Sequence, residues 1–210
     1  MEAMSIDGRS VRAKNIYDEV HKKLVQSAIE LFNNPDVPNE NINISLIAKN
    51  AGTSVATAYN HFPNNLNDVF GSIFNIGFQK IVEFVTEFNN DNPDPYDQLQ
   101  AFISIQTDTA IELGNALREA FYQFRELLMS GKWIKGEPYT FLKGICNDYV
   151  SKYRDIDASS LADDIFVLWN GYIYLWMRHN PNFEIWSRFT DEWLVHEMSK
   201  IVDKAISLQQ

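Results

Sequence analysis

The chain has 210 residues, enough for one substantial core or two modest domains, and its 45% apolar and 22% charged residues indicate a globular protein. Its formal net charge of -10 argues on its own against a nucleic-acid partner. The charge is uneven, however: residues 9–63 carry six Lys or Arg against five Asp or Glu, so only the N-terminal segment can approach a phosphate backbone without strong repulsion.

Basic residues precede and open the first predicted helix. Arg9, Arg12 and Lys14 lie in residues 1–14, which we expect to be a flexible arm, and Lys22 and Lys23 follow on the helix. Arms and helix starts often touch the DNA backbone, so these side chains are candidate phosphate contacts. A solvated N-terminus is the alternative for Arg9 and Arg12.

Residues 47–62, with the sequence IAKNAGTSVATAYNHF, predict two short helices joined by a turn. Gly52 follows the first helix, where a left-handed cap would end it. Thr53 and Ser54 then offer side-chain oxygens that can cap the second helix. This layout suits a helix that is presented to the major groove of DNA.

The second helix of this pair has two predicted faces. Val55, Ala58 and Phe62 are expected to pack inward, whereas Ala56 and Asn60 point the opposite way. An Asn can pair with the N6 and N7 edge of adenine, and a small side chain can meet the methyl group of thymine. Side chains on the flanks are expected to reach phosphate oxygens. The expected DNA-binding residues are Ser54, Val55, Ala56, Thr57, Tyr59, Asn60, His61, Lys22 and Lys23.

The pattern of this segment resembles the signature of the TetR family of bacterial transcription regulators. Its positions are Ile47-Ala48, Ala51-Gly52, Ser54, Thr57, Tyr59 and His61-Phe62. Residues 28–32 (AIELF) fit as well, because members commonly carry an A-x-x-L-F run that closes their first helix. The resemblance covers residues 20–66 and is far more specific than a bare helix-turn-helix match.

The resemblance implies a ligand-responsive regulator, most often a repressor, that binds a palindromic double-stranded DNA operator as a homodimer and is released by a small-molecule inducer. It implies an N-terminal three-helix bundle with the helix-turn-helix in residues 1–65, and a larger helical domain for ligand binding and dimerisation in residues 66–210. No cofactor or metal is implied.

Three features depart from the family pattern. Asn65 stands where members usually carry a phosphate-contacting lysine, and the link at residues 33–41 (NNPDVPNEN) is longer than usual and lacks the expected glycine. The second short helix carries no Lys or Arg, so specificity would depend on Asn60, Thr57, apolar contacts and DNA shape.

Amphipathic segments of helical length follow one another to the end of the chain, and no alternation is long enough to predict a sheet, so the predicted fold class is all-α. The linker NDNPDP is expected at residues 90–95. Helices are expected at residues 66–89, 96–113, 115–129, 138–153, 158–180 and 183–207.

A ligand cavity is expected among these C-terminal helices, lined largely by aromatic side chains, with an unidentified small and mostly apolar effector. The alternative for each aromatic candidate is that it simply packs in the core. The alternative for Gln106 is that, once buried, its amide hydrogen-bonds to a side chain on a neighbouring helix and not to a ligand. The candidates are Phe74, Phe78, Phe102, Gln106, Phe121, Phe124, Trp133, Trp169 and Tyr172.

The last two predicted helices carry more apolar surface than one subunit needs. The helix at residues 158–180 is apolar on every side and is therefore expected to be buried on every side, which favours a four-helix dimer interface. The alternative is that both helices fill a monomer core. The dimer-interface candidates are Phe166, Ile173, Tyr174, Met177, Trp193 and Met198.

Other function classes are disfavoured. The four histidines are scattered without metal-ligand spacing, and the sequence has no Gly-rich phosphate loop or G-x-S-x-G motif, so we expect no enzyme. The uncharged run at residues 165–177 is too short for a membrane span, and the single Cys146 fits a reducing, cytoplasmic location. The main alternative is a TetR-like ligand- or protein-binding module whose DNA binding has weakened.

Overall fold

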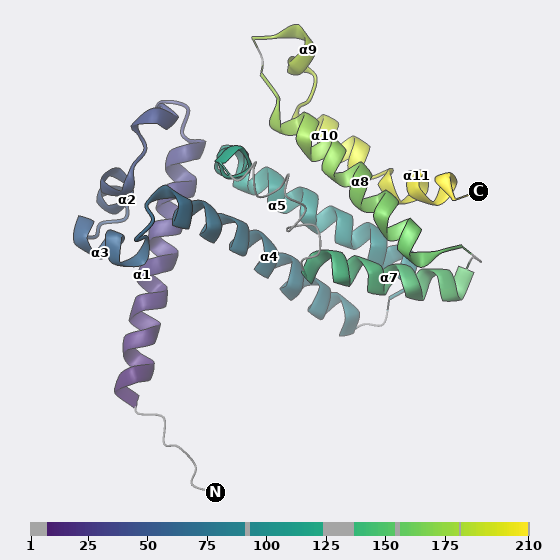
Figure 1. The fold of residues 1–210 in the computed structure, drawn as a ribbon, viewed down its shortest axis with the longest axis horizontal. Coiled ribbons are helices and arrows are strands. Elements are labelled where there is room, and N and C mark those ends of the chain that lie inside the picture. Colours follow the sequence, from purple (N-terminus) through teal and green to yellow (C-terminus); the bar gives the residue numbers. More distant parts are fainter. Residues whose placement is uncertain (1–7, 91–92, 124–136, 154–155, 181, 210) are drawn as a thin grey trace, which may run out of the picture. The chain divides into compact units, whose positions relative to one another are not determined.

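In the computed structural model, residues 8–90, 93–123, 137–153, 156–180 and 182–209 are described (Figure 1). None of these residues forms a strand, which agrees with the all-α prediction. Within them, no helix has the length and hydropathy needed to cross a membrane. The elements are α1 (Gly8–Asn33), η1 (Asn39–Asn41), α2 (Ile44–Asn50), α3 (Val55–His61), α4 (Leu66–Asn90), α5 (Pro95–Gln123), α7 (Glu137–Tyr153), α8 (Ala158–Met177), α9 (Glu184–Ser187), α10 (Asp191–Met198) and α11 (Ile201–Leu208).

The chain divides into two compact units: residues 1–74 with 113–123, and residues 75–112 with 124–210. The division differs from the expected boundary after residue 65. Aromatic packing explains the difference, because Phe70 of α4 lies against Phe32 of α1, with ring centroids 5.4 Å apart. Phe74 likewise meets Phe121 of α5 edge-on at 5.0 Å. The beginning of α4 and the end of α5 therefore belong to the first unit.

In the first unit, α2 packs against both α1 and α3. Leu24, Ala28, Ile47 and Ala58 have no exposed surface and form the centre of this packing. The Ser27 hydroxyl donates a hydrogen bond of 2.9 Å to the buried carbonyl oxygen of Ile47, which joins α1 to α2. The apolar periodicity of the sequence thus becomes one continuous core.

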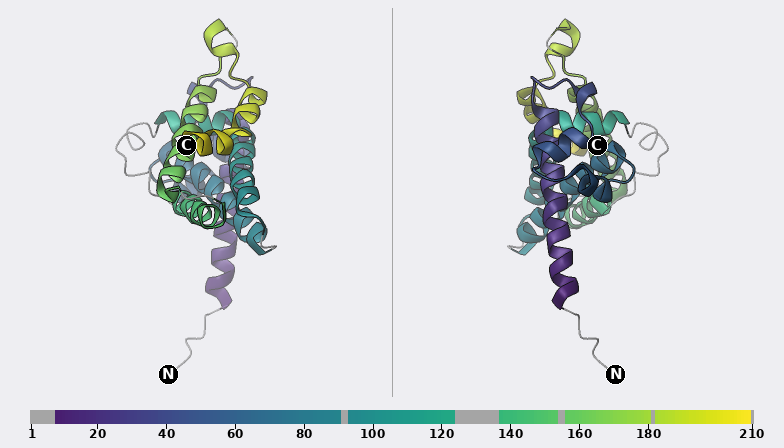
Figure 2. Two further views of the ribbon diagram at one scale, coloured as in Figure 1. Left: turned by 90° about the vertical axis from the view of Figure 1, so that its right-hand side faces the viewer. Right: turned by 90° about the vertical axis from the view of Figure 1, so that its left-hand side faces the viewer.

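The helix α1 begins at Gly8, so residues 8–14 are helical and not part of a flexible arm as expected. Its first turns extend beyond α2 and α3, as the views in Figures 1 and 2 show. Every residue from 11 to 19 is exposed. Residues 1–7 of the expected arm lie outside the described residues.

The helix α5 changes direction at Gly114, whose φ of 52° and ψ of -126° are not helical. This agrees with the break predicted between residues 113 and 115. Asn33, the last residue of α1, holds the bend from both sides: its Nδ2 donates to the Leu113 carbonyl oxygen at 3.2 Å, and its Oδ1 accepts from the Asn115 backbone N–H at 2.7 Å. A side chain thus caps the helix segment that follows Gly114.

In the second unit, α8 packs against α7, α10 and α11 (Figures 1 and 2). Leu161, Ile165 and Trp176 of α8 are fully buried, and Trp176 Nε1 donates to Asp191 Oδ1 at 2.7 Å. The helix is not buried on every side as expected, because Val167 and Tyr174 are 66% and 52% exposed.

The helix predicted at residues 183–207 consists of three helices, α9, α10 and α11. Thr190 starts a new helix, since its side chain accepts a hydrogen bond from the Trp193 backbone N–H at 3.3 Å. Lys200 separates α10 from α11 with a φ of -105° and a ψ of -4°. Residues 178–180 likewise lie beyond the end of α8.

Candidate functional site

The turn between α2 and α3 is fixed by backbone hydrogen bonds. Gly52 has a φ of +66°, as expected of a left-handed cap. Its N–H donates to the Lys49 carbonyl oxygen at 3.2 Å, and the Thr53 N–H donates to the Ala48 carbonyl oxygen at 3.0 Å. These two bonds form a Schellman motif, so α2 ends at a defined residue and the chain leaves it in a defined direction.

Ser54 begins α3 as the sequence predicts. Its Oγ accepts a hydrogen bond from the Thr57 backbone N–H at 3.0 Å and lies 2.7 Å from the Thr57 Oγ1. The two hydroxyl groups therefore satisfy each other and one of the free N–H groups at the helix start. This hydrogen bonding holds the first turn of α3 in place.

The faces of α3 differ from the prediction at two residues, Val55 and His61. Ala58 and Phe62 are fully buried as expected, but Val55 is 42% exposed and does not pack inward. Val55 is the first residue of α3, and the buried side chains of this helix, Ala58 and His61, come later in it. The exposed side chains of α3 are Val55, Ala56, Tyr59 and Asn60.

His61 does not lie on the flank of α3, where a phosphate contact was expected. It is 8% exposed, and its ring stacks on that of Tyr17 from α1 with centroids 4.0 Å apart. Its Nδ1 is buried, with no hydrogen-bond partner among the described residues. Burial, followed by the neighbouring His21, lowers the pKa of His61 from its ordinary value. The sequence could not show this, because Tyr17 is far away along the chain.

His21 of α1 is the second histidine of this cluster. Its ring lies 5.6 Å from that of His61 and 5.1 Å from that of Phe62, and its Nε2 lies 3.2 Å from the Ser72 hydroxyl of α4. Burial lowers the pKa of His21, while the carboxylate of Asp18 opposes this effect. Both rings are therefore favoured in the neutral form and serve as packing between α1, α3 and α4.

Asn65 lies in the turn that joins α3 to α4. It has a φ of 60°, in the left-handed region that Asn adopts more readily than a lysine does. Its N–H donates to the Phe62 carbonyl oxygen at 3.0 Å, and the neighbouring Asn64 N–H donates to Asp68 Oδ2 at 2.7 Å. The residue thus shapes the turn from α3 to α4.

The segment that contains α2 and α3 is free of acidic residues. Residues 41–67 include no Asp or Glu and one lysine, Lys49, in a chain of 28 acidic residues. Lys49 is exposed, as are Lys22 and Lys23 on α1. A charge count over short windows of the sequence would have found this segment. A surface without carboxylates repels a polyanion less than an acidic surface does.

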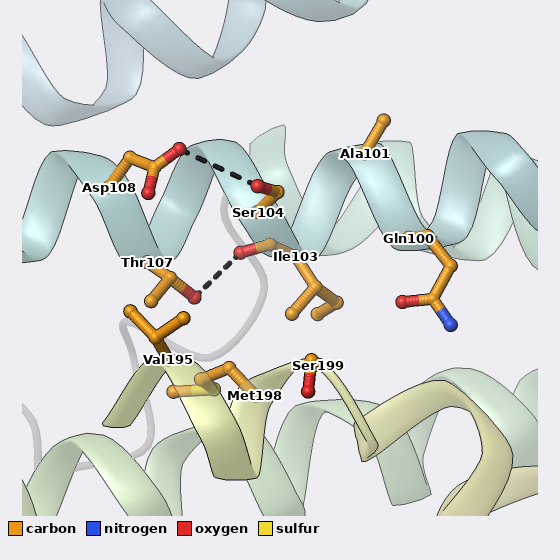
Figure 3. Close-up of a pocket in the computed structure, with 9 residues that line it drawn as sticks. All are labelled: Gln100, Ala101, Ile103, Ser104, Thr107, Asp108, Val195, Met198 and Ser199. Atoms are coloured by element: carbon orange, nitrogen blue, oxygen red, sulfur yellow. Dashed lines mark hydrogen bonds between the residues drawn. The ribbon is translucent and has the colours of Figure 1, made fainter. Parts of the chain in front are cut away.

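A cavity of about 350 Å³ lies in the second unit between α5 and α10. Figure 3 shows Gln100, Ile103 and Thr107 pointing from α5 toward α10. The lining residues are Gln100, Ala101, Ile103, Ser104, Thr107, Asp108, Val195, Met198 and Ser199. None of the predicted pocket residues that the structure describes is among them, and the lining combines apolar side chains such as Ile103 and Met198 with polar ones such as Gln100 and Thr107.

The predicted pocket residues have other positions. Phe102 is 2% exposed in the core, and the Gln106 amide donates to the Phe102 carbonyl oxygen on its own helix at 3.5 Å. The Tyr172 hydroxyl accepts from Lys204 Nζ at 2.7 Å. Trp169 Nε1 is buried without a hydrogen-bond partner in the described part of the chain. Phe78 is half-buried, whereas Phe124 and Trp133 lie outside the described residues.

The predicted dimer residues divide into two groups. Ile173 and Met198 are 1% exposed within a single chain, so their side chains have no area left for a partner. Tyr174 is 52% exposed, and its hydroxyl accepts from Arg178 Nη1 at 2.7 Å. Phe166, Met177 and Trp193 are half-buried. Tyr174 and Val167, which is not among the predicted interface candidates, mark the exposed apolar face of α8.

No group of three or more metal-ligating side chains occurs within the described ranges. No protein-family model matches the chain, and no curated protein matches it either.

Proposed function

We propose that the chain is a ligand-responsive, DNA-binding transcriptional regulator of the TetR type, which acts in the cytoplasm as a homodimeric repressor. The observation that carries the proposal is the α2–α3 segment. Two capped short helices are joined by a fixed turn, and the second presents four exposed side chains in a segment with no carboxylate. A helix-turn-helix needs these properties, because its second helix enters the major groove between two rows of phosphates.

Contacts to phosphate come from the expected Lys22 and Lys23 and from Lys49, which was not among the expected residues. With His61 buried and Asn65 part of a turn, the exposed Lys22, Lys23 and Lys49 supply the positive charge. Each neutralised phosphate contributes about -0.9 to the slope of log affinity against log salt concentration. A few lysines per subunit give a shallow slope, which dimerisation doubles.

A small-molecule effector binds in the second unit. The cavity between α5 and α10 has about 350 Å³, within the range of small-molecule sites. Both α4 and α5 contribute residues to the two units, so a shift in either helix passes along the backbone from one unit to the other.

Dimerisation uses the exposed face of α8. Val167, Gly171 and Tyr174 are exposed and recur at helical spacing, which makes a stripe of apolar and small residues along the helix. A twofold interface formed by the same stripe on each subunit gives two copies of α3, as a palindromic operator requires.

The proposal is tested with Asn60→Ala and the matched control Asn147→Ala, since both residues are exposed amides on helices. Genomic fragments bound by the full-length protein are selected at low salt, and the affinity of each variant is measured by fluorescence anisotropy. We expect Asn60→Ala to lose about 1–3 kcal/mol of specific binding and to remain dimeric, while Asn147→Ala binds normally. Equal binding by both variants, or no preferred fragment, contradicts the proposal and favours a ligand- or protein-binding module.

A further inference from the structure

The exposed side chains of α3 form one continuous face. At about 100° per residue, Val55, Tyr59, Ala56 and Asn60 follow one another around the helix axis within an arc of about 140°. Ala58 and His61 lie outside this arc, at about 300° and 240° from Val55, and are buried, as is Phe62, which follows the last residue of the helix. The accessible face of α3 therefore consists of these four exposed side chains.

Three of the four side chains on this face are apolar or aromatic, and Val55 and Tyr59 are 42% and 45% exposed. Asn60 carries the only amide on the face. The Thr57 hydroxyl is engaged with Ser54 at 2.7 Å. No residue of α3 is Arg or Lys, the side chains that pair with the O6 and N7 atoms of guanine.

These side chains match one type of base pair. In the major groove, thymine presents a methyl group, which apolar side chains contact, and adenine presents the N6 donor and N7 acceptor, which Asn pairs with. Recognition helices place their N-terminal residues against base edges, and Val55 and Ala56 are the first two residues of α3. The lack of carboxylates in residues 41–67 is compatible with the charge of the phosphates on either side.

We propose that the α3 face formed by Val55, Ala56, Tyr59 and Asn60 reads A·T base pairs in the major groove, through thymine methyl groups and one adenine edge, without a guanine-specific contact. This inference rests on the proposed function and names what the same site recognises. The operator half-site is then rich in A·T pairs at the positions under α3.

The test begins with duplexes that the full-length protein selects from a random library. In the best selected duplex, each thymine is replaced in turn by uracil, which lacks the methyl group, and each adenine and guanine by its 7-deaza analogue. We expect one or more uracil substitutions to lower affinity about 3- to 5-fold, as the burial of one methyl group implies. One 7-deaza-adenine should lower affinity clearly, and 7-deaza-guanine should leave it unchanged.

Two matched valines connect the effect to α3. Val55 and Val11 are 42% and 44% exposed, each on a helix of the first unit, so both Val→Ala variants should fold normally. In Val55→Ala, the penalty of at least one uracil substitution should disappear, whereas Val11→Ala should keep every penalty. In Asn60→Ala, the 7-deaza-adenine penalty should disappear in the same way.

The possible failures are distinguishable. If a sequence is selected but its affinity falls with 7-deaza-guanine and not with uracil, the A·T inference is overturned while the proposed function stands. If uracil penalties persist unchanged in Val55→Ala and Asn60→Ala, this face is not the reader, and the inference is again overturned. If the protein selects no sequence, because it binds all duplexes equally or binds none, both the inference and the proposed function fail.

Discussion

Gly114 is the residue on which the bend of α5 depends. Its φ of +52° is strained for residues with a Cβ atom, and a Cβ built at this position would lie 2.8 Å from the Asn33 Oδ1. The Asn33 side chain has to approach this closely in order to hydrogen-bond on both sides of the bend. A glycine is therefore required by both conformation and space.

We predict that Gly114→Ala lowers the free energy of unfolding by about 1–3 kcal/mol, measured by urea denaturation. Gly144→Ala is the matched control, since Gly144 lies within α7 and a Cβ there would meet nothing within 4 Å. Alanine at that position should stabilise the protein by about 0.5–1 kcal/mol. Destabilisation of the same size at both glycines would contradict this account of the bend.

The pair formed by the half-buried His21 and the buried His61 predicts a dependence of stability on pH. The pKa values of His21 and His61 are lowered in the folded state, so the unfolded chain binds more protons below the ordinary histidine value of about 6.5. Their contribution to stability is therefore complete above that pH and is lost as pH falls from about 6.5 toward the folded-state values.

We expect the melting temperature to fall between pH 7.5 and pH 5.5, and the double variant His21→Gln, His61→Gln to show a smaller fall. His196→Gln is the control, because His196 is exposed and lies outside the cluster. If the double variant keeps the full pH dependence, the two histidines are not its source.

Ser54 acts on a whole element, because its side chain caps α3. We predict that Ser54→Ala destabilises the protein by about 1 kcal/mol and speeds amide hydrogen exchange in α3, whereas Ser54→Asp, which can still cap, does so much less. Ser45 is an exposed serine on α2 and serves as the control. Ser45→Ala should change the free energy of unfolding by no more than about 0.5 kcal/mol and should leave amide exchange in α3 unchanged. Unchanged exchange in Ser54→Ala would show that the cap does not hold α3.

The sequence predicts the elements that depend on local signals. Gly52 and Ser54 lie at the ends of α2 and α3 as expected, and Gly114 divides α5, because caps and left-handed turns need particular residues. The division of residues 183–207 into three helices was not predicted. An apolar pattern that continues over Thr190 and Lys200 hides the two breaks.

The candidate site shows the same division between local and long-range signals. The exposure of Tyr59 and Asn60 follows from helical periodicity, but the burial of His61 depends on Tyr17, which is distant in the sequence. The cavity between α5 and α10 depends on how these two helices pack, and none of the predicted pocket residues in the described part of the chain lines it. Residues 41–67 could have been identified as acid-free from the sequence alone.

At the scale of the whole molecule, the proposed dimer depends on the exposed stripe of α8. Val167→Glu places a carboxylate in that interface, and an unpaired charge in a buried interface costs about 3 kcal/mol or more. We predict that this variant sediments as a monomer while its helical content is unchanged. Tyr122→Glu is the control, because Tyr122 is 73% exposed on α5 and should leave a dimer. A dimeric Val167→Glu would place the interface elsewhere.

The central claim, that the chain binds specific DNA as a dimer, is tested most directly by selection from random double-stranded DNA with the unmodified full-length protein at low salt. The account predicts enrichment of an inverted repeat whose half-site centres are about 34 Å apart, one turn of the double helix. Its affinity should fall with salt by a slope of a few units, as expected for a few phosphate contacts in each subunit. A selected pool without any common sequence would contradict the claim.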